Sequence, residues 1–261
     1  MARVIRLLLA YDGTAYCGWQ KQCQGEVTIQ ETIEQKLRII CRHTVTLHGA
    51  GRTDAGVHAL GMVAHFHTQV HHPLSAFVEG LNSLLPSDIR ILEAEEAEED
   101  FHSRFSAKCK TYRYDFFTGQ IVSPEKRLYM GHFPGFFQPF HAQKALGYLV
   151  GTHDFSSFEH AGSRNKEATG RGAIRTLFSA ECLPMPNVDQ GWSLRLCGDG
   201  FLRQMVRIIA GTVIEIGQMN KKNRLPENIQ QILLAQDRAA AGKTAPACGL
   251  FLEKVTYLSF E

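Results

Sequence analysis

A carboxylate and a guanidinium lie two residues apart in a glycine-rich segment at 47–61. The segment reads Leu-His-Gly-Ala-Gly-Arg-Thr-Asp-Ala-Gly-Val-His-Ala-Leu-Gly, so Arg52 and Asp54 lie between two apolar runs. Glycine at this density indicates tight turns, or a backbone that another group approaches closely. An aspartate held in such a turn can act as a nucleophile or a base. The alternative is a hairpin with solvated charges.

Two nucleotide-binding motifs can be tested on the same segment. A P-loop would end in Gly-Lys-Ser/Thr, which this segment lacks. A dinucleotide fingerprint that begins at Gly49 would need glycine where Asp54 stands. The segment therefore presents a carboxylate and does not form a phosphate cradle of either kind.

Composition limits the classes of protein that remain. The 261 residues are 44% hydrophobic, enough for one large domain or two small ones, and no apolar run approaches the twenty or so residues of a transmembrane helix. The first residues lack the features of a signal peptide. Seven cysteines without a Cys-x-x-Cys pair favour free thiols in a reducing cytoplasm. The twelve histidines include His65 and His67 on one face of an expected strand, but no recognisable ligand set, so no metal is expected.

Charge is segregated along the chain although the net charge is only +2. Residues 93–100 carry six carboxylates and no basic residue, whereas residues 101–130 carry six basic residues against two acidic ones. Residues 160–176 add further arginines and a lysine. Such a chain can bind a polyanion through one basic face. Ordinary solvated surfaces would give the same pattern.

The first half of the chain predicts a strand–helix–strand–strand–helix–strand order. Strands are expected at 2–11, 44–49, 59–69 and 89–97, and helices at 28–42 and 75–85. The capping box Thr28-Ile-Gln-Glu31 and apolar residues at helical spacing support the first helix. This order is that of ferredoxin-like domains.

The second half is expected to repeat this order. Strands are expected at 107–117, 173–182, 192–198 and 249–259, and helices at 140–150, 201–217 and 226–236, with a polar loop at 156–172. The chain therefore predicts two α+β subdomains, residues 1–105 and 106–261, whose sheets could be continuous.

Six segments, in order, resemble the TruA family of tRNA pseudouridine synthases. They are residues 11–20, 51–58, 101–107, 112–114, 151–158 and 200–207, and they extend over nearly the whole chain; loop 159–172 matches no family segment. The resemblance implies the pseudouridine synthase fold, with two ferredoxin-like (βαββαβ) subdomains around a central, mixed, mostly antiparallel sheet. It also implies a homodimer that needs no cofactor or metal. The implied reaction is isomerisation of uridine to pseudouridine at positions 38–40 of the tRNA anticodon stem-loop. A non-catalytic tRNA-binding or tRNA-folding protein on the same scaffold is the alternative.

The resemblance also assigns roles to residues. Asp54 is the expected nucleophile, and the sequence leaves open whether it attacks the sugar C1′ or the base C6, or abstracts a sugar proton. Arg207 is expected to keep the Asp54 carboxylate ionised as its ion-pair partner; the alternative is a helix-surface charge next to Arg203. Tyr112 is expected to stack on the flipped-out uracil and can accept the C5 proton, or else it is a core tyrosine.

The remaining basic residues are candidates for RNA contact. Arg52 is expected either to take the place of the flipped base or to hold its phosphate. Further phosphate contacts are expected of Lys108, Lys110, Arg164, Lys166 and Arg171. Each of these could equally be an ordinary solvated side chain.

Overall fold

A computed structural model describes residues 3–22, 25–163, 170–219 and 224–257. The chain divides into two compact units, one formed by Met1–Lys108 together with Phe251–Glu261 and the other by Cys109–Leu250. The last strand is thus grouped with the first unit, whereas the expected subdomains divide the chain only once, at 105/106. That subdomain boundary stays a prediction.

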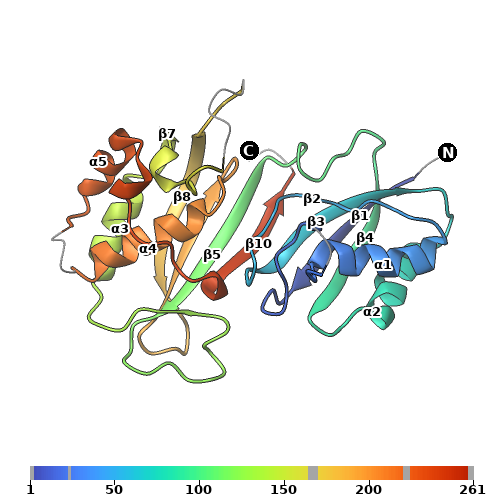
Figure 1. The fold of residues 1–261 in the computed structure, drawn as a ribbon, viewed down its shortest axis with the longest axis horizontal. Coiled ribbons are helices and arrows are strands. Elements are labelled where there is room, and N and C mark those ends of the chain that lie inside the picture. Colours follow the sequence, from blue (N-terminus) through green and yellow to red (C-terminus); the bar gives the residue numbers. More distant parts are fainter. Residues whose placement is uncertain (1–2, 23–24, 164–169, 220–223, 258–261) are drawn as a thin grey trace. The chain divides into compact units, whose positions relative to one another are not determined.

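The first unit has the strand–helix order expected from the sequence. Its elements are β1 (Arg3–Tyr11), α1 (Ile29–Cys41), β2 (His48–Gly49), β3 (His58–Thr68), a π-helical turn η1 (Ala76–Gly80) that continues into α2 (Leu81–Leu84), β4 (Ile89–Ala97) and β10 (Leu250–Thr256) (Figure 1). The sheet order is β4-β1-β3-β10, and β2 also pairs with β3. All of these pairs are antiparallel except β3 with β10.

The core of the first unit lies between one face of this sheet and helices α1 and α2. The β1–β3 register sets Ile5 opposite Phe66, and the next core residues of β1 follow at every second position. Ile33 and Leu37 of α1 are fully buried, and Phe77 of η1 contacts Phe66 edge-on at a ring separation of 5.5 Å. The buried side chains that alternate along the strands therefore pack against those at helical spacing on α1, and together they form one apolar layer.

Helix α1 is tied to the loop at 12–20 through its first turn. Thr28 is the N-cap, and its hydroxyl accepts a hydrogen bond from the Glu31 N–H, as the capping box predicts. The first two N–H groups of the helix donate to the carbonyl oxygens of Gly18 and Trp19 at 3.1 and 3.0 Å. The start of α1 therefore fixes one end of that loop.

The second unit contains the remaining elements. They are β5 (Cys109–Phe117), β6 (Gly131–His132), α3 (Pro139–Gly147), β7 (Gly151–Asp154), η2 (Ser156–Phe158), β8 (Ile174–Pro184), β9 (Gly191–Gly198), α4 (Met205–Gly217), α5 (Asn228–Ala235), η3 (Arg238–Ala240) and η4 (Ala247–Gly249). The strand order is β5-β9-β8-β7 with antiparallel pairs, and β6 runs parallel to β5. Along the chain, β5, α3, β8, β9, α4 and β10 repeat the order of the first half.

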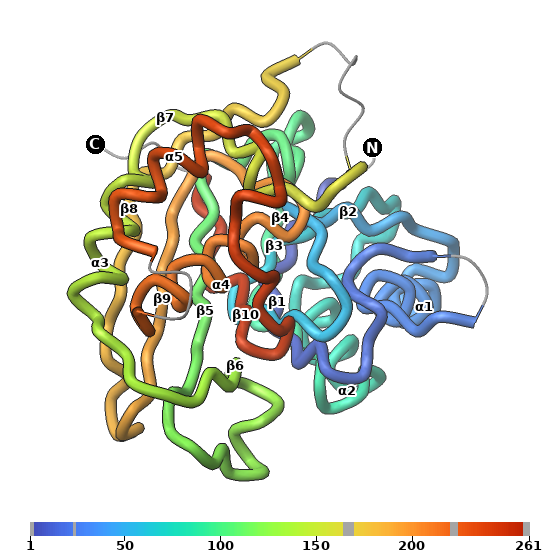
Figure 2. Tube along the Cα trace, turned by 60° about the vertical axis from the view of Figure 1, so that its left-hand side comes forward, coloured from blue at the N-terminus to red at the C-terminus, as the bar shows by residue number. Residues whose placement is uncertain are grey.

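Helix α4 is the most buried helix of the second unit. It packs next to α3 and β5 (Figure 2), and eleven of its thirteen residues are buried. Among the described residues, no helix has the length and apolar character to cross a membrane.

Several elements differ from the sequence prediction. Helix α4 begins at Met205 and not at 201, because Gln204 adopts a left-handed conformation with φ of 60° that a helix cannot continue through. The strand expected at 44–49 is reduced to His48–Gly49, and the second helix begins as a π-helical turn. Strands β6 and β7 have two and four residues, too few to produce a period-two pattern.

The Thr28 cap gives a prediction about stability. Thr28→Ala removes the acceptor for the Glu31 N–H, so the free energy of unfolding should fall by about 1 kcal/mol. Thr28→Ser keeps an acceptor and should lose less. Urea denaturation followed by circular dichroism measures both, and equal stability of Thr28→Ala and wild type would contradict the capping role.

Candidate active site

Asp54 lies on a loop between β2 and β3 whose backbone is hydrogen-bonded to the loop at 12–20. The Trp19 N–H donates to the Thr53 carbonyl at 3.1 Å, and the Gly56 N–H donates to the Tyr16 carbonyl at 3.3 Å. These two bonds flank Asp54 on either side. The half-buried Asp54 is therefore carried by a backbone segment fixed at both ends.

Two glycines of the 12–20 loop are required by this close approach. A Cβ on Gly13 would lie 2.0 Å from the Val57 carbonyl oxygen, and a Cβ on Gly18 would lie 2.5 Å from the Thr53 carbonyl oxygen. Gly18 also has a φ of +95°, which side chains rarely tolerate. Peptide groups of the two loops are thus in direct contact, and this explains the glycines of the segment at 11–20.

Buried side chains hold the base of the Asp54 loop. The hydroxyls of Tyr11 and Thr53 are hydrogen-bonded at 2.8 Å in the interior. The Trp19 ring is 2% exposed, and a Cβ on Gly49 would lie 2.6 Å from it. Sequence reasoning gave these residues no role, although all except Thr53 and Gly49 lie in the segment 11–20.

His58 joins the two loops at the start of β3. Its Nδ1 lies 3.1 Å from the Gly13 nitrogen and 3.1 Å from an Asp12 carboxylate oxygen. One tautomer accepts from the Gly13 N–H, and the other donates to Asp12. The ring is 1% exposed and stacks on Phe251 at 4.7 Å. His58 is thus a buried support of the Asp54 loop that sequence reasoning missed.

Arg52 is exposed on the same loop and is linked to α1 through Gln20. Its Nε donates to the Gln20 side-chain oxygen at 3.0 Å, and the Gln20 amide nitrogen donates to Gln30 at 2.6 Å. An exposed guanidinium held at its Nε can contact a substrate without losing its orientation.

Tyr112 lies on β5 in the second unit. It is 7% exposed and pairs in register with Leu196 of β9. Its ring meets that of Phe201 at 5.0 Å and 78°. Since Phe201 precedes α4, the structure brings the segments at 112–114 and 200–207 together within this unit.

Arg207 is anchored on α4 by the chain segment that passes along the helix. Its Nε donates to the Ala245 carbonyl at 2.9 Å, and the Ala245 N–H donates to the Arg207 carbonyl at 3.0 Å. A Cβ on Gly211 would lie 1.8 Å from the Lys243 carbonyl oxygen, so this glycine permits the approach. Arg203 is exposed and precedes the helix. Arg203 and Arg207 therefore do not share one edge of α4, and the role of Arg207 stays a prediction.

The other basic candidates have varied environments. Lys108 is exposed and Lys110 is half-buried. Arg171 donates to the Asp199 carboxylate at 2.6 Å. Arg164 and Lys166 lie outside the described residues.

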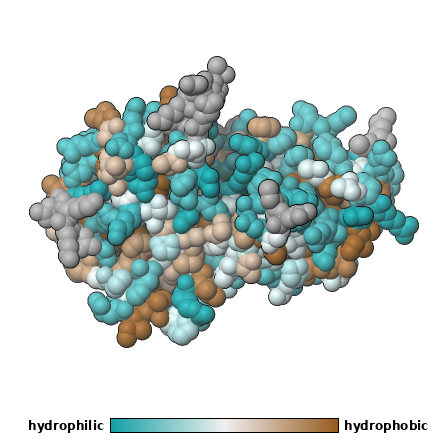
Figure 3. Space-filling model, viewed as in Figure 1, coloured by the Kyte–Doolittle hydropathy of each residue, from teal (hydrophilic) through white to brown (hydrophobic). Residues whose placement is uncertain are grey.

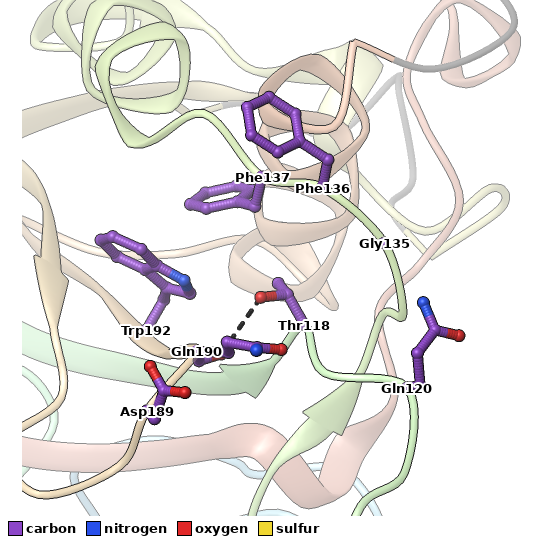
Figure 4. Close-up of a pocket in the computed structure, with 8 residues that line it drawn as sticks. All are labelled: Thr118, Gln120, Gly135, Phe136, Phe137, Asp189, Gln190 and Trp192. Atoms are coloured by element: carbon purple, nitrogen blue, oxygen red, sulfur yellow. Dashed lines mark hydrogen bonds between the residues drawn. The ribbon is translucent and has the colours of Figure 1, made fainter.

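A cavity of about 480 Å³ in the second unit is a separate feature. Its walls include Phe137, Trp192 and Thr118, whose hydroxyl donates to the Gln190 carbonyl (Figure 4). The eight lining residues include none of the site residues expected from the sequence. No group of three or more His, Cys, Asp or Glu side chains in the described parts of the chain could hold a metal ion.

The expected site residues are thus fixed in two groups. Asp54 and Arg52 belong to the first unit, and Tyr112 and Arg207 belong to the second. Asp54 and Arg207 lie in different units, and their pairing stays a prediction.

Comparison with known proteins identifies the class. A family model described as tRNA pseudouridine synthase matches residues 8–106 and 145–258. The chain belongs to this family of isomerases, which convert uridine to pseudouridine, and the match confirms both the resemblance and the α+β pseudouridine synthase fold.

Individual relatives are similar over nearly their whole length. A protein of Desulfotalea psychrophila named tRNA pseudouridine synthase A 1 is 48% identical over 256 residues, which is 98% of this chain and 100% of the relative. Proteins named tRNA pseudouridine synthase A from Geotalea uraniireducens and Bacillus pumilus are 45% and 42% identical over 255 residues each. These alignments cover 98% and 97% of this chain, and 100% and 98% of the two relatives.

The contact of Gly13 with Val57 gives a prediction about the loop. Gly13→Ala places a methyl group against a backbone carbonyl, so stability should fall by about 1–3 kcal/mol and pseudouridine formation at least about tenfold. Gly147→Ala is the matched control, since a Cβ there has no neighbour within 4 Å. Denaturation curves and turnover measure both variants. Wild-type stability and turnover in Gly13→Ala would show that the contact does not position Asp54.

Proposed function

We propose that this protein isomerises uridine to pseudouridine at positions 38–40 of the tRNA anticodon stem-loop. Membership of the tRNA pseudouridine synthase family supports the reaction class and the tRNA substrate. The observation that carries the proposal for this chain is the half-buried carboxylate of Asp54 on a loop held by backbone hydrogen bonds on both sides.

The reaction needs only groups that side chains can supply. The bond between ribose C1′ and N1 breaks, the base turns, and C1′ forms a bond to C5. The C5 proton leaves and N1 gains a proton, so there is no net oxidation or reduction. Asp54 starts the sequence as an ionised carboxylate, by attack on C1′ or C6 or by abstraction of a sugar proton.

Arg207 and Tyr112 complete the proposed set of groups. Arg207 is the proposed ion-pair partner of Asp54, and its anchoring to residue 245 supports a fixed cation at this position. Tyr112 is proposed to stack on the everted uracil and to accept the C5 proton. Base flipping costs a few kcal/mol, and one aromatic stack returns about 1–3 kcal/mol.

Phosphate contacts are proposed for the exposed basic residues. Arg52 is proposed to hold a phosphate or to replace the flipped base, and its exposure supports either role. Lys108, which is exposed, and Lys110, which is half-buried, are proposed to contact phosphates through their side chains. Arg171 can exchange Asp199 for a phosphate at little cost, because surface ion pairs contribute only about 0–1 kcal/mol.

A cytoplasmic homodimer is the proposed form of the protein. The six cysteines in the described residues are free thiols, which suits a reducing compartment. Large apolar side chains are exposed on the second unit, namely Ile121 at 86%, Phe136 at 71% and Phe140 at 71%. Contact with a second copy of the chain would cover side chains of this kind.

Substitution of Asp54 tests the chemistry. Asp54→Asn keeps the side-chain shape but removes the charge, so product formation should fall at least about 10³-fold, while the Kd for tRNA stays within about threefold of wild type. Tritium release from C5-labelled uridine and mapping of pseudouridines in the treated tRNA measure the reaction. Asp189→Asn, at an exposed carboxylate, is the matched control.

Three results would contradict the proposal. Near-normal turnover in Asp54→Asn would remove Asp54 from the chemistry. Pseudouridine found only outside positions 38–40 would overturn the assigned substrate position. Binding of tRNA by the wild type without tritium release would favour the non-catalytic alternative.

The dimer has its own test. Light scattering at micromolar concentration should give a mass close to twice the 29.2 kDa of the chain. Bovine serum albumin in the same buffer calibrates the measurement. A mass of one chain would contradict the proposed dimer.

A further inference from the structure

Four histidines meet on the face of the first unit's sheet that lies opposite α1. His65 and His67 are on β3, His48 is on β2, and His102 belongs to the segment at 101–107. The His65 ring lies 5.1 Å from that of His48, 4.7 Å from His102 and 5.7 Å from His67. We call these four residues, together with Arg104 and Phe105, the histidine face.

His65 anchors the segment at 101–107 to the sheet. It is 1% exposed, and its Nδ1 accepts a hydrogen bond from the Ser103 N–H at 3.2 Å. The Ser103 hydroxyl donates to the His48 carbonyl at 2.6 Å, and the Tyr257 hydroxyl donates to the Ser103 carbonyl at 2.7 Å. The residues that follow Ser103 are therefore presented from a fixed base.

Phe105 projects from this base as an exposed ring. It is 76% exposed, and its ring lies 4.3 Å from the His102 ring. The guanidinium carbon of Arg104 lies 5.7 Å from the centre of the Phe105 ring. A planar apolar ring is thus supported by an imidazole and has a cation beside it. This combination suits stacking with a planar base on the exposed side.

Burial and the neighbouring imidazoles disfavour the protonated forms of His65 and His102. Burial is the main cause that lowers the pKa of His65 to about 4, and the neighbouring His102, His48 and His67 contribute to the same lowering. Burial also lowers the pKa of His102, with further lowering by His48, Arg104 and His67. These two imidazoles are therefore neutral near pH 7, where a ring N–H can donate a hydrogen bond to a phosphate oxygen, and Arg104 supplies the positive charge of the face.

The exposed Phe105 ring and the Arg104 cation beside it narrow the choice of ligand. The molecular surface seen in Figure 3 is mainly hydrophilic, with separate hydrophobic patches. The imidazoles of the histidine face stack on or abut one another, and no metal-binding group is found among the described residues. A ligand with phosphates and planar bases matches both the charge and the exposed ring.

We propose that the histidine face binds tRNA, with Phe105 stacked on an unpaired base and His48, His67, His102 and Arg104 along the adjoining phosphates. The inference rests on the proposed function for its choice of RNA. Unpaired bases are required because the faces of a base inside a helix are covered by its stacked neighbours. The face supplies affinity in addition to the contacts at the reacting uridine.

Removal of the ring is the first test. Phe105→Ala should raise the Kd for tRNA about 5- to 100-fold at fixed salt, with kcat at saturating tRNA within about twofold of wild type. Phe105→Trp keeps a stacking ring and should restore affinity. Leu92→Ala is the control, since Leu92 is 46% exposed in the same unit next to Glu93. Fluorescence anisotropy gives the Kd, and thermal melting checks the fold.

Removal of the charge is the second test. Arg104→Gln should reduce the slope of log K against log salt concentration by roughly 0.7–0.9, the change expected for one lost phosphate contact. An unchanged Kd in Phe105→Ala, with an unchanged slope in Arg104→Gln, would overturn the proposal. A halved molecular mass in Phe105→Ala would assign the ring to contact between two copies of the chain instead.

The results separate this inference from the isomerase proposal. If the wild-type protein forms pseudouridine and Phe105→Ala binds tRNA normally, only the proposal for the histidine face fails. If Phe105→Ala loses tRNA binding while the wild-type protein forms no pseudouridine, the proposal for the histidine face stands and the isomerase proposal fails.

Discussion

Direct contact between two peptide backbones is the constraint on which the candidate site depends. Gly13 and Gly18 have no Cβ. The carbonyl groups of Val57 and Thr53 therefore approach the backbone at these glycines more closely than any residue with a side chain would allow. Such a contact has almost no freedom to adjust. The position of the backbone that carries Asp54 is therefore set by three elements that are distant in sequence: the end of β1, the start of α1 and the start of β3. The loop backbone around Asp54 is thus positioned by the fold itself.

The second unit fixes its own groups by the same means. The Arg207 side chain and main chain both bond to residue 245, and Gly211 makes room for the segment that carries it. Tyr112 is held edge-to-face against Phe201. Fixed positions of this kind matter wherever side chains carry out a reaction, because a displacement of about 1 Å can reduce the rate 100-fold. Backbone contacts hold positions of this kind more firmly than exposed ion pairs do.

Local patterns predicted the elements of the fold well, and long-range contacts explain what they missed. The capping box at Thr28 and the apolar spacing after it gave α1 within a residue or so at either end. The common face of His65 and His67 is also confirmed, since both lie opposite the Phe66 side of β3. Their neighbours His48 and His102 come from other segments, and no local pattern shows that they approach. The start of α4 depends on one left-handed residue, Gln204, which helical spacing does not reveal. For the site, the glycines of 11–20 were the available signal, but their contact with 53–57 follows only from the tertiary fold.

The parallel pairing of β10 with β3 has a consequence for how the protein is made. Phe251 lies opposite His58 in that pairing and covers its ring, so the support of the Asp54 loop includes a residue from the far end of the chain. The second unit is one continuous stretch, Cys109–Leu250, and contains all of its own strands before translation ends. The first unit begins earlier yet gains its last strand only when residues 251–256 have left the ribosome. The half that is synthesised first is therefore the half that finishes folding last.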